Sequence, residues 1–296
     1  MPQSRSTTGG FLALTAAALF GVSGAVAGGI FDALDPARVA QVRSLIAAIL
    51  LVAWAWYRGT LHPGNGLWKF ALLGLNLALV NVTFYWAIDL LGVGPGATVQ
   101  FLGPIFVLVW IAVVRKEKIG PWAWLASAAA VFGVGLVTEA WGIEPSDAKG
   151  LAAGLAAAVL FATYLLLGES LGREYKPSQL GAWGFIFASL IWAIVLPWWT
   201  FPATEAASVL PQLLIIGVLG TALPFIIEFL ALSMTSSGIV GIVATAEPPI
   251  GAVTAAILLD QSLAPTQWVG IAIVVAAVAV VQWRGLSDMH PATPIA

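Results

Sequence analysis

The sequence predicts an all-α membrane protein with ten transmembrane helices arranged as two inverted five-helix repeats. Of its 296 residues, 60% are hydrophobic and only 9% are charged, and the mean hydropathy is +0.97. A soluble domain carries about 25% charged residues, so this chain cannot cover a soluble surface. The apolar residues also run in segments of about twenty, the length that a helix needs to cross a bilayer.

Ten such segments follow one another, separated by short linkers rich in Pro, Gly and charged residues. The predicted spans are Gly9–Phe31, Ala37–Tyr57, Leu67–Leu90, Gly94–Val114, Pro121–Val137, Gly150–Leu167, Ser178–Trp198, Leu210–Leu232, Ser237–Leu259 and Pro265–Trp283. The first is long enough to span, so we expect it to remain in the protein and not to act as a cleaved signal peptide. The linkers leave no room for a separate soluble domain.

The distribution of Lys and Arg predicts the orientation. With the N-terminus placed inside, nine of the twelve Lys and Arg residues fall on the cytoplasmic side, two fall outside and Arg43 lies within the second span. Cytoplasmic loops of membrane proteins carry the excess of Lys and Arg. We therefore expect both termini to be cytoplasmic, in a bacterial inner membrane.

An internal repeat supports the two-part organisation. A shift of 144 positions, or of 141 in the earlier part, superimposes similar residues in one constant order. The matches are Pro104 with Pro248, Pro121 with Pro265, Trp124 with Trp268, Gly94 with Gly238, Phe20 with Phe161 and Pro36 with Pro177. We expect repeats over residues 1–140 and 141–296. Because each holds five spans, the second enters the membrane from the opposite side, as in secondary transporters whose substrate site lies near the midplane.

Glu247 is the most unusual residue at membrane depth. It lies within the apolar stretch Gly238–Gly251 and is followed by Pro248 and Pro249. An acidic residue at a helix centre costs about 2.5 to 3.5 kcal/mol, and proline removes backbone donors at the same depth. We expect a kink here and a carboxylate that faces a polar interior, with Pro104 and Pro248 as hinges. A buried Glu that joins two helices by hydrogen bonds is the simpler alternative.

Other polar and aromatic residues also fall within the membrane spans. The candidate substrate-binding residues are Arg43, Asn81, Tyr85, Gln100, Tyr164, Phe225, Glu228, Phe229 and Glu247. Asn81 and Tyr85 lie one helical turn apart and share a face. Each has a structural alternative. Arg43 can extend to the surface, and Asn81 and Gln100 can link helices. The aromatic residues can pack in the core, and Glu228 can pair with a polar loop or a helix end.

Composition argues against several classes of protein. Cys is absent and there are only two His, so a thiol nucleophile, a His-based metal site and a Ser–His–Asp set are not expected. The sequence shows no Walker-type glycine loop for ATP and no basic run for nucleic acid. We expect no cofactor and no metal. A membrane-embedded enzyme and a pore remain as alternatives from other classes.

Five stretches form a recognisable pattern together with Arg43: Asn81–Tyr85, Gln100–Pro104, Thr221–Leu232, Ala246–Pro248 and Leu263–Gln267. They resemble the drug/metabolite transporter superfamily in its ten-span EamA branch, and the resemblance covers about Gly9 to Trp283. Within that branch the chain is most similar to bacterial threonine/homoserine exporters. Gln100 departs from the pattern, since those exporters carry Glu there. Aromatic amino-acid exporters of the superfamily are a looser match.

The resemblance implies export of small amino acids from the cytoplasm by alternating access. A zwitterion needs an anionic partner, which Glu247 or Glu228 can supply, and a cationic or amide partner, which Arg43, Asn81 or Gln100 can supply. Alternative substrates are aromatic amino acids, other metabolites and lipophilic drugs. Proton antiport and facilitated diffusion both stay open, with facilitated diffusion favoured because the spans contain no His and no paired Asp. The expected partners are the substrate and the lipid bilayer, with the chain acting as a monomer.

Overall fold

The computed structural model describes residues 2–91, 93–140, 148–258 and 262–288, and this part of the chain is built from helices without strands. Nine of its helical stretches are long and apolar enough to cross a membrane, and α6 is a shorter apolar helix of 17 residues. The prediction of an all-α membrane protein is therefore confirmed. The predicted repeat boundary at 140/141 borders residues 141–147, which lie outside the described residues, so this division stays a prediction.

The elements follow the order of the predicted spans. The first half holds α1 (Pro2–Gly28), α2 (Pro36–Tyr57), α3 (Leu67–Leu91), α4 (Val93–Gln100), α5 (Gly103–Val113) and α6 (Pro121–Val137). The second half holds α7 (Ala148–Gly172), α8 (Pro177–Val195), a 3₁₀ turn (Trp198–Thr200), α9 (Ala203–Ser208), α10 (Leu210–Gly217), a π-helical turn (Val218–Ala222), α11 (Leu223–Leu232), α12 (Ser237–Ala244), α13 (Glu247–Leu258) and α14 (Pro265–Asp288).

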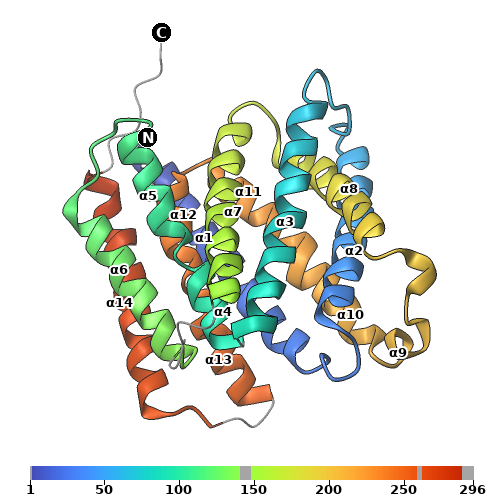
Figure 1. Ribbon diagram of the computed structural model, residues 1–296. Coiled ribbons are helices and arrows are strands. Elements are labelled where there is room, and N and C mark those ends of the chain that lie inside the picture. The colour runs from blue at the N-terminus through green and yellow to red at the C-terminus, as the bar shows by residue number, and fades with distance from the viewer. Residues whose placement is uncertain (1, 92, 141–147, 259–261, 289–296) are drawn as a thin grey trace.

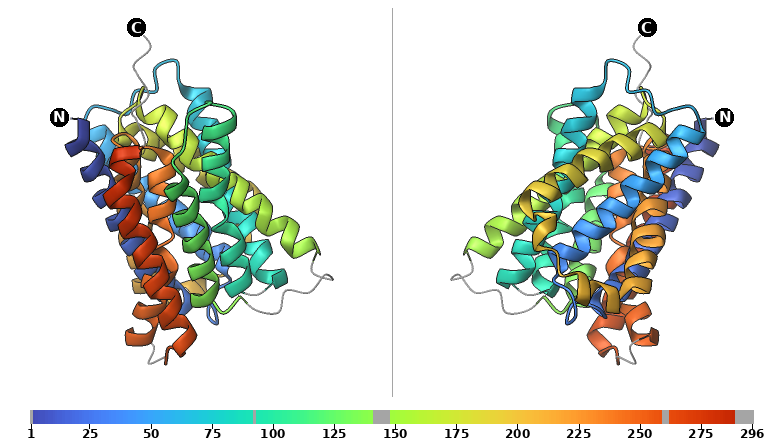
Figure 2. Two further views of the ribbon diagram at one scale, coloured as in Figure 1. Left: turned by 90° about the vertical axis from the view of Figure 1, so that its left-hand side faces the viewer. Right: turned by 90° about the vertical axis from the view of Figure 1, so that its right-hand side faces the viewer.

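The helices form one bundle, and α1 begins at the same end of it as α14 ends (Figures 1 and 2). We call this end the terminal end. Contacts between the halves are reciprocal: α3 packs on α7 as α11 packs on α1, while α2 packs on α8 and α6 on α14. This pairing is what a two-fold relation between two five-span repeats requires.

Two predicted spans, the fourth and the ninth, are each broken into two helices. The first break is a turn at Phe101–Leu102 between α4 and α5, and the second is a turn at Thr245–Ala246 between α12 and α13. The breaks lie 144 positions apart, the same shift that superimposes Pro104 on Pro248. Both prolines lack an N–H and disfavour a helical residue before them, so each helix is interrupted just upstream. The predicted kink at Glu247 is confirmed, and the fourth span is interrupted in the same way upstream of Pro104.

Three further boundaries differ from the prediction. The sixth span does not end at Leu167, because α7 continues to Gly172 and carries Glu169 as a paired, buried residue. The seventh ends at Val195, one residue before the Leu196–Pro197 step that disfavours helix. The eighth contains a π-helical turn directly before Leu223–Pro224, where the proline has no N–H to offer the helical ladder.

Small residues let the helices approach closely. A Cβ added to Gly270 of α14 would lie 2.6 Å from the carbonyl oxygen of Gly133 in α6, so these two backbones touch. In the same way a Cβ on Gly21 of α1 would lie 2.6 Å from the carbonyl oxygen of Glu247. Small residues at helix interfaces are the common device of membrane bundles. Close packing is therefore the structural role of these glycines, and at Gly21 it places α1 against the start of α13.

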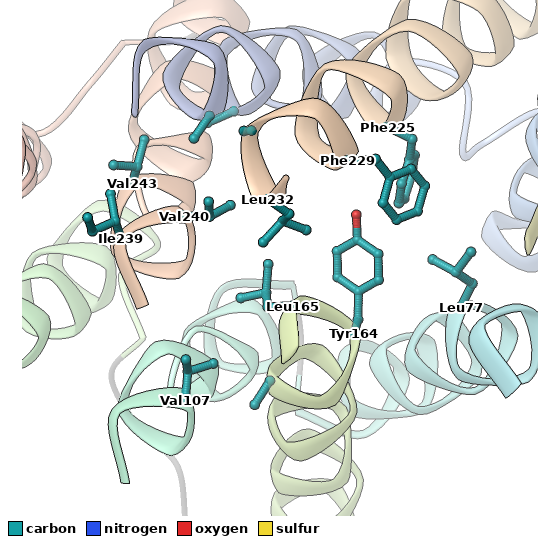
Figure 3. Packing of buried hydrophobic residues seen from close by; sticks show 14 of the residues in the cluster. Leu77, Val107, Tyr164, Leu165, Phe225, Phe229, Leu232, Ile239, Val240 and Val243 are labelled. Carbon is teal, nitrogen blue, oxygen red and sulfur yellow. The ribbon is translucent and has the colours of Figure 1, made fainter. Parts of the chain in front are cut away.

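The main core lies at the centre of the bundle between both halves. Figure 3 shows Tyr164 and Leu165 of α7 pointing toward Phe225, Phe229 and Leu232 of α11, with α12 beside them. Phe229 and Leu165 are fully buried. A smaller cluster at the other end joins the ends of α1 and α2 to α9 and α10. The central core is the environment in which the candidate polar residues are held.

Candidate functional site

The centre of the candidate site is the buried carboxylate Glu228 on α11. The buried positions of this helix include Phe225, Glu228, Phe229 and Leu232, a spacing of three and four residues that marks one helical face. Glu228 is 5% exposed and accepts a hydrogen bond from the Tyr164 hydroxyl, with Oη and Oε2 2.7 Å apart. A carboxylate buried this deeply requires a partner, and α7, from the same half, supplies it. The predicted alternative of a pair with a helix end is wrong, because the partner is a side chain in the middle of α7.

Aromatic rings surround this hydrogen bond. Tyr164 contacts Phe225 and Phe229 edge-on, at ring-centroid distances of 5.8 and 5.9 Å. Phe225 also meets Phe20 of α1 at 5.0 Å and Phe185 of α8 at 4.8 Å. Four helices thus contribute rings to one wall, which excludes water around Glu228 and offers an apolar surface next to a charge.

Glu247 begins α13, directly after the break in the ninth span, and its side chain is half-buried. It interacts electrostatically with Glu228 and with Arg43 of α2. Because α13 starts here, its positive dipole end lies at membrane depth, although Pro248 and Pro249 supply no N–H groups there. The tight contact with Gly21 fixes the position of this helix start. Glu247 is therefore within electrostatic range of both the Glu228 carboxylate and the Arg43 guanidinium.

Arg43 and Tyr85 are within electrostatic range of each other. Both side chains are half-buried, and Arg43 interacts electrostatically with the Tyr85 hydroxyl as well as with Glu247. Among the described residues Arg43 makes no hydrogen bond and no ion pair. A guanidinium without a bonded partner at this depth retains all five donors for an incoming anion.

Asn81 and Gln100 have different surroundings. Asn81 donates from Nδ2 to the Leu77 carbonyl of its own helix at 2.7 Å, so the predicted alternative of a link between helices does not hold for this bond. The Gln100 carbonyl oxygen Oε1 is buried and accepts no hydrogen bond from the described part of the chain. The next residue, Phe101, contacts Phe161, which stacks on Tyr164. Gln100 is therefore one residue away from the aromatic wall and has an open acceptor.

The structure thus connects most of the predicted site residues by direct interaction. Hydrogen bonds, ring contacts and electrostatic interactions join Arg43, Tyr85, Tyr164, Phe225, Glu228, Phe229 and Glu247. Within the described residues, no hydrogen bond joins the Asn81 or Gln100 side chain to this group. Whether any of the nine binds substrate stays a prediction. The described residues contain no cluster of His, Cys, Asp or Glu that could hold a metal ion.

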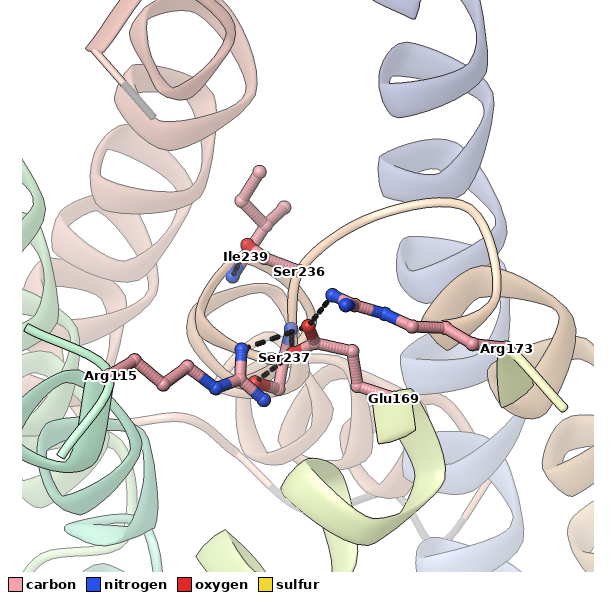
Figure 4. A network of polar contacts seen from close by, with 6 residues as sticks. All are labelled: Arg115, Glu169, Arg173, Ser236, Ser237 and Ile239. Carbon is pink, nitrogen blue, oxygen red and sulfur yellow. Dashed lines mark hydrogen bonds and ion pairs between the residues drawn. The ribbon is translucent and has the colours of Figure 1, made fainter. Parts of the chain in front are cut away.

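A polar network at the terminal end escaped sequence analysis. Glu169 of α7 is 3% exposed and accepts hydrogen bonds from Arg115 Nη1 at 2.9 Å and Arg173 Nη2 at 2.7 Å. It also accepts from the backbone N–H and the hydroxyl of Ser237, at 2.9 and 2.6 Å (Figure 4). We call these four residues the Glu169 network. It ties the end of α5 to α7 and to the start of α12.

One signal in the sequence pointed to part of this network. Glu169 and Arg173 are four residues apart, which is the spacing of an ion pair on one helix. This spacing indicates that the sixth helix continues past its predicted end at Leu167.

The repeat gives the network no counterpart at the opposite end. The shifts that superimpose the halves bring Glu169 onto Gly28, Arg115 onto Leu259 and Ser237 onto Val93. The two ends of the bundle are thus chemically different.

A helical bundle of two repeats, with two broken helices and with charged residues inside membrane spans, is typical of secondary membrane transporters. The chain belongs to the EamA-like transporter family, which matches residues 7–139 and 148–283. Each matched segment covers one repeat.

Individual relatives agree with this assignment. The chain is 30% identical over 207 residues to the threonine/homoserine exporter RhtA of Escherichia coli (strain K12), which covers 69% of this chain and 67% of the relative. It is 24% identical over 277 residues to the uncharacterized transporter YwfM of Bacillus subtilis (strain 168), covering 90% and 91%. It is 25% identical over 290 residues to the uncharacterized inner membrane transporter YicL of Salmonella typhimurium (strain LT2), covering 92% and 95%.

The fold also has a solved counterpart. One crystal structure superimposes with a TM-score of 0.77 over 96% of this chain and 99% of that chain, at 17% identity. This likeness supports the fold alone.

Proposed function

We propose that this protein exports small amino acids of the threonine/homoserine type from the cytoplasm across a bacterial inner membrane. The observation that supports the proposal is the set of opposite charges within the membrane spans, with Glu247 in electrostatic range of both Glu228 and Arg43. Glu228 and Glu247 are acceptors for an α-ammonium group, and Arg43, which lacks a bonded partner among the described residues, is a donor set for an α-carboxylate. A zwitterion of amino-acid size matches two such poles, and RhtA, the relative at 30% identity, is named as an exporter of such compounds.

Within this proposal, side-chain selectivity comes from the remaining residues. The hydroxyl of threonine or homoserine is a donor, and the open Gln100 Oε1 and the second oxygen of Glu228 are acceptors within the same bundle centre. Asn81 and Tyr85 extend the polar side. Tyr164, Phe225 and Phe229 form the apolar side. Buried polar groups that a substrate must satisfy discriminate strongly against substrates that leave them unpaired.

Alternating access fits the two breaks. The turns at Phe101–Leu102 and Thr245–Ala246, upstream of Pro104 and Pro248, let each span bend at mid-depth. The Glu169 network joins α5, α7 and α12 at the terminal end, and the excess of Lys and Arg predicts that this end is cytoplasmic. We infer that opening this network admits substrate from the cytoplasm and that closing it accompanies release outside.

An aromatic or lipophilic substrate is the second candidate. Rings from α1, α7, α8 and α11 meet in one wall, which favours a substrate with a larger apolar part.

Counterflow in proteoliposomes tests both candidates. Vesicles loaded with one unlabelled compound should accumulate its labelled form, for a panel containing threonine, homoserine, phenylalanine and a lipophilic cation. Threonine and homoserine should exchange fastest in the native protein. Faster exchange of phenylalanine would favour the second candidate, and exchange of no amino acid would refute the proposal.

A further inference from the structure

A groove separate from the bundle centre opens at the terminal end between α2, α8 and α11. Its volume is about 300 Å³, and its lining includes Arg58 and Lys176 on the rim and Ile226 and Leu230 of α11 on the apolar side. Thr60 and Ser178 line it as well and share a buried hydrogen bond of 2.7 Å, which joins the end of α2 to the start of α8. The groove is therefore built by three helices that stay connected at this point.

Both cations lie where a bilayer places its headgroups. Arg58 directly follows α2 and Lys176 directly precedes α8, so each is at the limit of a membrane span. Neither pairs with a carboxylate in the described part of the chain, whereas Lys69 pairs with Glu174 and Arg115 with Glu169. Two exposed positive charges meet on one rim without an internal counter-ion. Their natural counter-charge is an anion from outside the protein.

The rest of the lining is apolar and reaches into the membrane span. Trp54 lies one helical turn before Arg58 and is 38% exposed, as is Leu230 on α11. Ile226 and Leu230 are four residues apart and so lie on one face of α11. Glu228 lies between them in sequence and points into the core. The groove thus offers charge at headgroup depth and an apolar track at acyl-chain depth.

We propose that this groove binds an anionic phospholipid. Its phosphate lies between the Arg58 guanidinium and the Lys176 ammonium, and one acyl chain follows Trp54, Ile226 and Leu230. Basic pockets between transmembrane helices bind acidic headgroups by the same chemistry. A free phosphate would satisfy the cations alone, whereas a lipid also covers the apolar track, and the lipid is the occupant that matches both halves of the lining.

Native mass spectrometry of the purified full chain in detergent tests the proposal. The protein is titrated with phosphatidylglycerol, with phosphatidylcholine of the same acyl chains, and with glycerol phosphate. Phosphatidylglycerol should bind at least about ten-fold more tightly than the other two. The double variant Arg58→Gln with Lys176→Gln should bind it about 30-fold more weakly, from roughly five-fold for each basic residue near an anionic surface.

The control removes two charges from the same end of the bundle but outside the groove. Lys116→Gln with Lys118→Gln alters two exposed residues and should leave phosphatidylglycerol binding within about two-fold of native. Leu230→Trp fills the apolar track without changing charge and should also weaken lipid binding, which keeps the test valid if the double variant folds poorly. Equal binding of phosphatidylcholine, equal binding of glycerol phosphate, or an effect of the control as large as that of the double variant would each overturn the proposal.

Discussion

Glu169→Gln should open the terminal end of the bundle. The substitution keeps the shape and volume of the side chain and removes the charge that four donors share. One of the two carboxylate oxygens is replaced by an NH₂ group, which is a donor and cannot accept the hydrogen bonds that this oxygen accepted. Ser237 is fully buried, and no water can replace the lost acceptor for its N–H.

The free energy that the closed arrangement loses in this variant can be estimated from the four hydrogen bonds to Glu169. Hydrogen bonds to a charged group contribute about 1.5 to 3 kcal/mol and neutral ones about 0.5 to 1.5, so each of the two Ser237 bonds loses about 1 kcal/mol. Arg115, with 24% of its side chain exposed, adds about 1 kcal/mol more. Arg173 is 63% exposed, and solvent screens its contribution to near zero. The closed arrangement should lose about 3 kcal/mol, or roughly two decades in the closed-to-open equilibrium.

Cysteine labelling measures this opening directly, because the native chain has no Cys. Val240→Cys places a thiol one turn inward from Ser237, at a position that is 1% exposed. Adding Glu169→Gln should raise its maleimide labelling rate about 100-fold, whereas adding Arg173→Gln should raise it less than about five-fold. If labelling stays unchanged while the melting temperature falls, the network stabilises the folded bundle without controlling access, and this reasoning is refuted.

Three other predictions concern the site, the helix packing and the energy source. Glu247→Gln should weaken apparent substrate affinity about ten-fold at normal thermal stability, because a charge-assisted bond becomes a neutral one; unchanged transport of every amino acid tried would remove Glu247 from the mechanism. Gly270→Ala should destabilise the protein by about 1 to 3 kcal/mol, since its Cβ would lie 2.6 Å from the Gly133 carbonyl oxygen. Gly24→Ala is the control, because a Cβ there meets open space and should not destabilise the protein. Equal melting temperatures of the two variants would disprove the close contact. Collapsing the pH gradient in proteoliposomes should leave amino-acid counterflow intact, and abolished counterflow would show obligatory proton coupling.

Several site residues could be predicted one by one from the sequence, because a charged side chain within a membrane span is costly whatever its orientation. Glu228 and Glu247 stand out in apolar segments on that ground alone. Their partners could not be expected, because the Tyr164–Glu228 hydrogen bond joins residues 64 positions apart. Whether two such side chains meet depends on the rotation of each helix about its axis. In so apolar a chain, hydrophobic periodicity barely defines that rotation.

The Glu169 network shows the same limit more sharply. A Glu near the end of an apolar segment is typical of a solvated linker, and the sequence alone predicted the span to end before it. Three chain segments had to be brought together before four donors could surround that carboxylate and keep α7 helical to Gly172.

Composition and the covalent chemistry of single residues were enough to predict the membrane class, the spans, the repeat and the interruptions near Pro104 and Pro248. The pairing of the charges, the ring contacts around Glu228 and the groove shared by Arg58 and Lys176 could be seen only in the folded protein. Those outcomes depend on contacts between helices distant in sequence, and packing geometry alone sets them.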